Sequence, residues 1–254
     1  MSFFPNEEKD IFYALDKSFS CYWQIFKKII PWAFFLTLTE GIATYGNAHL
    51  SNSIFYWLCL GLESRVFLFF FGAMFYQANS ILEERSVALS DACRVMLQRF
   101  VPMYLTFVVF LVFIVGYSCL SYYVMHLISK NAHAGHFLLN LFFLFSLALL
   151  MVFIVFFLFS LPLILLDGFS PLKAIMQSYQ LSRSRPAPIF TVYASMALIA
   201  VAVFPRTKHA HFLMQHHVWL LFDFVMYCIL LPFVVNYMLF ILNDLKVRFR
   251  NLDK

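Results

Sequence analysis

Eight histidines are the most chemically distinctive side chains in this sequence, and four of them fall in one run, KHAHFLMQHH, at residues 208–217. Histidine binds zinc, copper or nickel, and it titrates near neutral pH. His209 and His211 are two positions apart and His216 and His217 are adjacent, so neither pair shares a helical face. A divalent metal, the only cofactor that the sequence indicates, would bind them from an extended or turned loop. The alternatives are a pH-sensing role and ordinary interfacial histidines that bind no ligand.

Ionisable residues within apolar segments form a second group of candidates. Glu40 lies roughly 16 Å along a segment that begins at Ile29, at a rise of 1.5 Å per residue, and a charge at such a depth is costly in a membrane. Arg65 is the nearest partner in sequence, and a Glu40–Arg65 pair would lock the first helical hairpin. Alternatively, Glu40 binds a proton or an ion. Asp223 would lie near the histidines at the outer surface, whereas Asn236 is expected to join neighbouring helices.

The elements that position these side chains are predicted to be membrane-spanning helices. Hydrophobic residues make up 63% of the 254 residues and charged residues only 12%, whereas about a quarter of residues are charged in soluble domains. Apolar runs of about 18 or more residues predict spanning helices. We therefore predict an all-α polytopic membrane protein, a single integral membrane domain over residues 1–254 with six spans, at residues 29–48, 63–82, 100–127, 137–166, 187–204 and 218–242. Residues 54–62 either extend the second span or lie in the interface.

The distribution of positive charge predicts the orientation of these spans. Fourteen of the 18 Lys and Arg residues fall on one side, which faces the cytoplasm by the positive-inside rule. Both termini are then cytoplasmic, and all eight histidines fall on the outer side. The net charge of +5 includes no basic stripe interleaved with polar residues, so we expect no nucleic-acid partner. The predicted partners are membrane lipids and, as a second candidate, another membrane protein.

Three segments that precede the odd-numbered spans resemble one another. They are predicted to be amphipathic helices in the cytoplasmic interface, because they are too short and too charged to span, at residues 11–27, 87–99 and 171–184. Each places a small residue four positions after an alanine, and each ends near a proline that can open the next helix; the small residues are Ser18, Ala92 and Ser178. The predicted architecture is an interfacial helix followed by a helical hairpin, repeated three times.

One stretch, LPLILLDGFSPLKAIMQSYQLSRSR (161–185), carries a family-like motif. An apolar helix ends in Pro162 and Asp167, and a turn at Ser170 and Pro171 leads into an amphipathic helix with a central Ser178. The stretch resembles the signature of the YciC-like bacterial inner-membrane proteins, which are similar to the membrane domain of some glycerophosphodiester phosphodiesterases. The resemblance implies a six-span protein of the bacterial inner membrane with no established activity. It does not account for the histidine-rich outer segments.

Sequence motifs of common enzymes are missing: H-E-x-x-H, G-x-S-x-G and G-x-x-x-x-G-K-[ST] do not occur. We therefore predict a non-enzymatic multi-pass inner-membrane protein with a structural, lipid-associated or membrane-complex scaffolding role. The alternative is a transporter or permease for an ion, metal or small solute, with a His/carboxylate entry site on its outer face. Polar residues are sparse in the middle of the spans, which favours the first function over the second.

Overall fold

The computed structural model describes a large part of the chain. Its described backbone covers residues 4, 11–50, 54–130, 159–184 and 217–252, with single positions or short pieces at 141–142, 144–146, 149–150, 187, 191 and 194. All elements within these ranges are helices: α1 (Ile11–Leu50), α2 (Ile54–Leu82), α3 (Leu89–Lys130), α5 (Ser160–Asp167), α6 (Pro171–Ser184) and α9 (His217–Leu252). The all-α prediction therefore holds for the described part of the chain.

Three of the described helices are long and apolar enough to cross a membrane. The candidate spans are Gly61–Leu82 in α2, Leu89–Leu127 in α3 and Phe224–Arg250 in α9. Such helices satisfy their backbone hydrogen bonds internally, which the hydrocarbon core of a bilayer requires. The chain therefore has the features of a helical membrane protein. The number of six spans and the threefold repeat stay predictions, since most of residues 137–158 and 187–204 lie outside the described part.

Several predicted boundaries differ from the helices that form. Residues 11–27 and 29–48 are not separate helices, because α1 is continuous with Pro31 inside it. α3 likewise continues past Pro102. Proline removes one helical hydrogen bond and bends a helix without having to end it. Residues 54–62 belong to α2 and extend the second helix. The end of the predicted fourth span is helical, as α5, which begins at Ser160.

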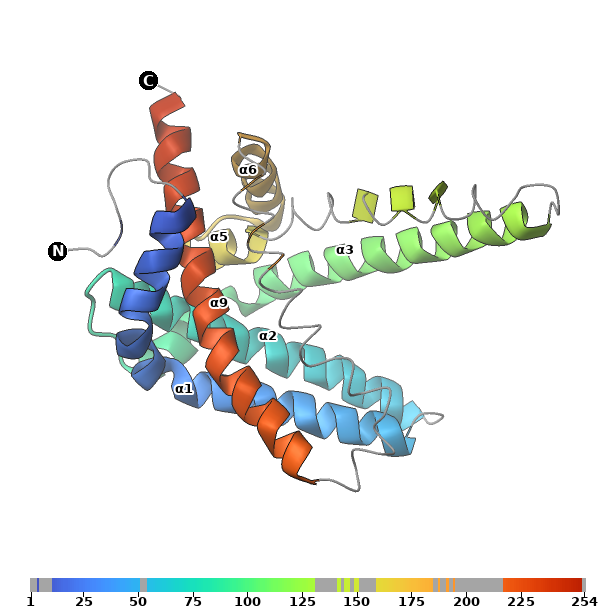
Figure 1. Ribbon diagram of the computed structural model, residues 1–254, viewed down its shortest axis with the longest axis horizontal. Helices are drawn as coiled ribbons and strands as arrows, with labels where there is room; N and C mark the ends of the chain where they lie inside the picture. The colour runs from blue at the N-terminus through green and yellow to red at the C-terminus, as the bar shows by residue number, and fades with distance from the viewer. Residues whose placement is uncertain are drawn as a thin grey trace. The chain divides into compact units, whose positions relative to one another are not determined.

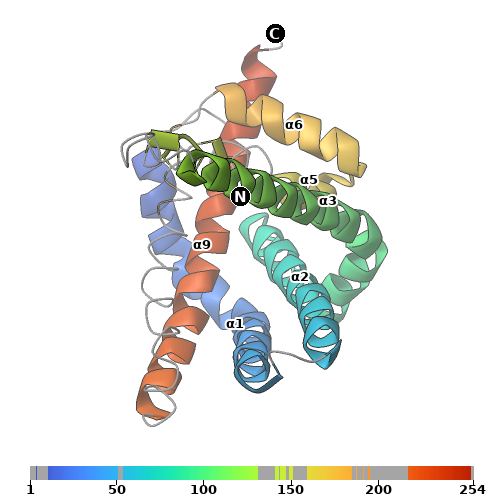
Figure 2. The ribbon, with the colours of Figure 1, turned by 90° about the vertical axis from the view of Figure 1, so that its right-hand side faces the viewer.

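The helices α1, α2 and α9 form one compact unit, which comprises residues 1–100 and 183–254. α1 changes direction along its length, as Figures 1 and 2 both show. Its first half packs against α9, with ring centroids of Phe19 and Phe233 4.6 Å apart. Its second half packs against α2, where the rings of Phe35 and Phe70 stack at 5.2 Å, and also against α9, where the ring centroids of Phe34 and Phe224 lie 5.5 Å apart. The bend therefore lets one helix line two neighbours.

The face that α1 turns inward is lined by small and aliphatic side chains. Its buried stripe follows helical spacing and consists of Ala14, Ser18, Cys21, Ile25 and Ile29. α9 is buried almost without interruption over residues 234–242. Small residues let two helix backbones approach closely, and this close approach drives helix association where lipid and protein are equally apolar.

Enlarging Ser18 tests this close packing. Ser18 is fully buried, and we expect Ser18→Leu to lower the free energy of unfolding by about 1–3 kcal/mol, because the added carbons have no room between α1 and α9. The matched control is Ser20→Leu, because Ser20 is exposed two residues further on. Thermal unfolding in detergent, followed by far-ultraviolet circular dichroism, measures both. Equal losses in the two variants would contradict the packing that we describe.

Residues 101–182 form a second compact unit. In it, the Tyr117 hydroxyl of α3 donates a hydrogen bond of 2.8 Å to the carbonyl of Ser146. α5 ends at Gly168, whose φ of 69° is the left-handed conformation that favours glycine, and its N–H donates to the Ile164 carbonyl at 3.1 Å. The Ser170 carbonyl then accepts the first helical hydrogen bond of α6 from Ala174 at 2.9 Å. α6 begins at Pro171, which suits a first helical turn.

Candidate functional site

Polar side chains join the three helices of the first unit along a polar seam, which we define as Ser18, Trp32, Thr37, Gln77, Cys228 and Asn236. The Trp32 indole N–H donates to the Gln77 side-chain oxygen and joins α1 to α2. The Cys228 thiol donates to Thr37 at 3.3 Å, and the Asn236 amide donates to the Ser18 carbonyl at 2.9 Å. The prediction that Asn236 joins neighbouring helices is therefore confirmed.

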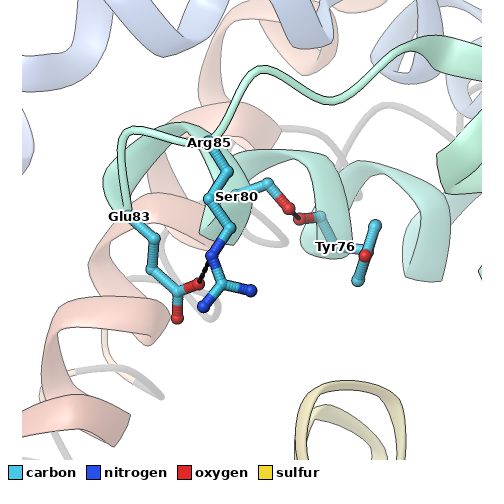
Figure 3. A network of polar contacts seen from close by, with 4 residues as sticks. All are labelled: Tyr76, Ser80, Glu83 and Arg85. Carbon is cyan, nitrogen blue, oxygen red and sulfur yellow. Dashed lines mark hydrogen bonds and ion pairs between the residues drawn. The ribbon is translucent and has the colours of Figure 1, made fainter.

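Three hydroxyl groups of this unit, those of Ser18, Thr37 and Ser80, bond to the backbone rather than to an activating base. The Ser18 hydroxyl donates to the Ala14 carbonyl at 2.6 Å, and that of Thr37 to the Ala33 carbonyl at 2.7 Å. Ser80 donates in the same way to the Tyr76 carbonyl at 2.9 Å (Figure 3). A nucleophilic hydroxyl needs a base within hydrogen-bond reach. These three hydroxyls instead satisfy their polar atoms within their own helices.

Tyr22 adds a further link between α1 and α9. Its phenol donates a hydrogen bond of 2.6 Å to the Ile229 carbonyl. Burial raises the pKa of Tyr22 from 10.0 to about 12, since desolvation disfavours the phenolate. The proton that this hydrogen bond needs is therefore held throughout the neutral range. The stabilisation of the folded state by the protonated Tyr22 phenol is complete below pH 10. It is lost as the phenol deprotonates while the pH rises toward 12.

Two buried polar atoms have no hydrogen-bond partner within the described part of the chain. They are the Ser178 hydroxyl oxygen in α6 and the side-chain oxygen of Asn236 in α9. Both residues are fully buried, and an unsatisfied buried polar atom costs free energy. Ser178 is also a residue of the family-like motif, and it lies on the buried face of α6. Pro162, in α5, is buried too.

The predicted Glu40–Arg65 pair can be placed only by helix register. The Phe35–Phe70 contact belongs to an antiparallel pair of helices, because Trp32 bonds to Gln77 further along α2. Position 40 lies five residues after Phe35 and position 65 lies five residues before Phe70, so the antiparallel register places the two positions opposite each other. The Glu40 side chain lies outside the described residues, whereas the Arg65 side chain is exposed. The pair stays a prediction that the register favours.

The outer histidines cannot be placed in the same way. His209, His211 and His216 lie outside the described residues, and so do the side chains of His217 and Asp223, although α9 includes both positions. Within the described part of the chain, no three His, Cys, Asp or Glu side chains are close enough together to hold a metal ion. His126 is exposed, and its ring stacks on Tyr122 with centroids 6.4 Å apart. The metal and pH-sensing hypotheses therefore stay predictions.

Two ion pairs with opposite degrees of burial lie at helix ends. Arg248 and Asp244 meet at 2.7 Å in α9, with each side chain only 10% exposed. Arg85 and Glu83 meet at 3.2 Å after α2, in the open (Figure 3). The buried pair was not predicted, although its i, i+4 spacing in the sequence is the signal that could have indicated it.

The amphipathic segments expose large apolar side chains, which is the reverse of a helix in a soluble protein. Phe12 and Trp23 in α1 are 82% and 66% exposed, Leu97 in α3 is 68% exposed, and Leu172 in α6 is 78% exposed. The small residues Ser18, Ala92 and Ser178 of the same segments are fully buried. Each segment thus buries a small residue and presents large apolar side chains to the surroundings.

No protein-family model, curated protein or solved structure matches this chain. The resemblance to the YciC-like proteins therefore stays an expectation from the residues of one motif. The three candidate spans indicate a membrane protein without any relative, because they are identified from helix length and hydropathy alone.

Proposed function

We propose that this chain is a non-enzymatic, multi-pass protein of the bacterial inner membrane, with both termini in the cytoplasm. Its role is structural and lipid-associated, or it scaffolds a larger membrane complex. One observation carries the proposal: three amphipathic segments bury a small residue and expose large apolar side chains, among them Trp23, Leu97 and Leu172. Such faces are stable where lipid or another apolar surface covers them.

The bend of α1 supports the same proposal. Its first half, with exposed Phe12, Phe19 and Trp23, runs at an angle to the second half that packs on α2 (Figure 2). An amphipathic helix that lies along a leaflet and then turns into a span has this form. Aromatic residues are enriched at the level of the headgroups because their rings are amphipathic. The polar seam supports a structural role as well, since its groups bond to one another across helices.

Native mass spectrometry of the protein released from a membrane mimetic tests the proposal. Wild type is compared with a variant in which His209, His211, His216 and His217 are all replaced by alanine. We expect retained phospholipid or a partner subunit in both forms, and no bound metal in either. A divalent metal that is present in wild type and lost in the variant would favour the transporter or sensor instead. Wild type that retains neither lipid nor partner would contradict the proposed function.

A further inference from the structure

The bend of α1 carries two adjacent lysines, Lys27 and Lys28, shortly before Pro31. Both side chains are exposed. Within the described part of the chain, neither forms an ion pair or a hydrogen bond. Pro31 has no N–H to give to the carbonyl of Lys27, which is why a helix bends at such a position. Two ammonium groups are thus presented on the surface of the bend.

Apolar side chains flank Lys27 along one exposed face of α1, and Lys28 is turned about 100° from that face. Trp23 lies one helical turn before Lys27 and therefore on the same face. Ile30 and Phe34 follow on that face, and Phe34 is 45% exposed. The Trp23 ring lies 5.6 Å from the Phe26 ring, in an edge-to-face contact that supports it from α1 itself. Along the helix axis, this face therefore carries apolar Trp23, then basic Lys27, then apolar Ile30 and Phe34.

Lys27 and Lys28 lie five and four residues before Trp32, whose indole N–H bonds to Gln77 of α2. No acidic side chain of the described part of the chain forms an ion pair with either lysine. The two ammonium groups therefore attract an anionic group to this part of α1.

We propose that the bend of α1, at Lys27 and Lys28 beside Trp23, binds the headgroup phosphate of an anionic phospholipid. The ammonium groups contact the phosphate, Trp23 lies at the level of the glycerol backbone, and Ile30 and Phe34 contact the acyl chains. A free phosphate ion would use the lysines alone and leave the apolar side chains on either side without a role. This inference rests on the proposed lipid-associated function and names the lipid class.

The lysines set the expected size of the effect. Each basic residue at an anionic lipid surface contributes about a fivefold gain in affinity. Replacing both lysines by glutamine should therefore lower the affinity for anionic lipid about 25-fold. Affinity for a zwitterionic lipid should be nearly unchanged. Because both lysines are exposed, added salt should weaken the binding of anionic lipid to wild type.

The experiment titrates the full chain in detergent with dioleoyl phosphatidylglycerol and, separately, with dioleoyl phosphatidylcholine, and counts bound lipid by native mass spectrometry. The variants are Lys27→Gln with Lys28→Gln, and the charge-preserving Lys27→Arg with Lys28→Arg. The matched control removes the same charge elsewhere, with Lys173→Gln and Arg183→Gln on α6, where both side chains are exposed. We expect the first variant to lose its preference for phosphatidylglycerol and the other two to keep it within about threefold.

Four results would overturn the inference. Equal losses in the glutamine variant and the α6 control would show diffuse attraction instead of a site. An unchanged preference in the glutamine variant would exclude these lysines. Wild type that retains both lipids equally would overturn this inference alone, whereas wild type that retains neither lipid would also contradict the lipid-associated role proposed above. An unchanged thermal midpoint of the variants shows that folding is not the cause of any loss.

Discussion

Trp32→Ala should lower the free energy of unfolding by about 3–5 kcal/mol, which is the usual cost of deleting a large buried aromatic side chain. Trp32 is only 4% exposed. Its ring lies 6.0 Å from Phe70, and its indole N–H donates to Gln77. Removing it leaves a cavity between α1 and α2 and takes away the donor that the buried Gln77 oxygen uses. Both effects act in the same direction.

Trp23→Ala is the matched control, because the same side chain is deleted from the same helix at a position that is 66% exposed. We expect its unfolding free energy to change by less than about 1 kcal/mol. Far-ultraviolet circular dichroism during titration with sodium dodecyl sulfate measures both variants without depending on tryptophan fluorescence. If Trp23→Ala were as destabilising as Trp32→Ala, the division of α1 into a buried and an exposed face would be wrong.

Asp244→Asn should destabilise the protein by about 3 kcal/mol, because it breaks a buried ion pair and leaves a buried guanidinium without the charge that faces it. The Arg248 Nε lies 2.7 Å from the Asp244 carboxylate, and each side chain is only 10% exposed. Asparagine keeps the shape of the side chain but carries no charge. The effect should therefore report electrostatics rather than packing.

Two comparisons separate charge from other causes. Glu83→Gln breaks the ion pair with Arg85, in which the arginine side chain is 72% exposed, and it should cost less than about 1 kcal/mol because solvent screens such pairs. Asp244→Asn combined with Arg248→Met should recover much of the lost stability, since no buried charge is left. Detergent unfolding titrations of all four proteins test this. A double variant no more stable than Asp244→Asn would argue against the charge explanation.

Some properties of this protein follow from local sequence alone. Composition and apolar run length determine the helical membrane class, because the bilayer selects for segments of sufficient length and hydropathy. The start of α6 at Pro171 follows from a serine–proline pair whose geometry is local. Asn236 was expected to join helices because a polar group in a span needs a partner nearby. These features depend on neighbours in the chain.

Other features were decided only by the tertiary structure. The sequence analysis places Trp23 in an interfacial helix and Trp32 in a span, but only the packing of α2 and α9 makes Trp32 buried and leaves Trp23 exposed. Proline was expected to open new helices, yet α1 continues through Pro31, with both halves packed on α9 and the second half also on α2. Hydropathy cannot make these distinctions, since lipid and protein core are similarly apolar. The face that a helix buries is therefore set by shape and by interhelical hydrogen bonds, which exist only once the helices have assembled.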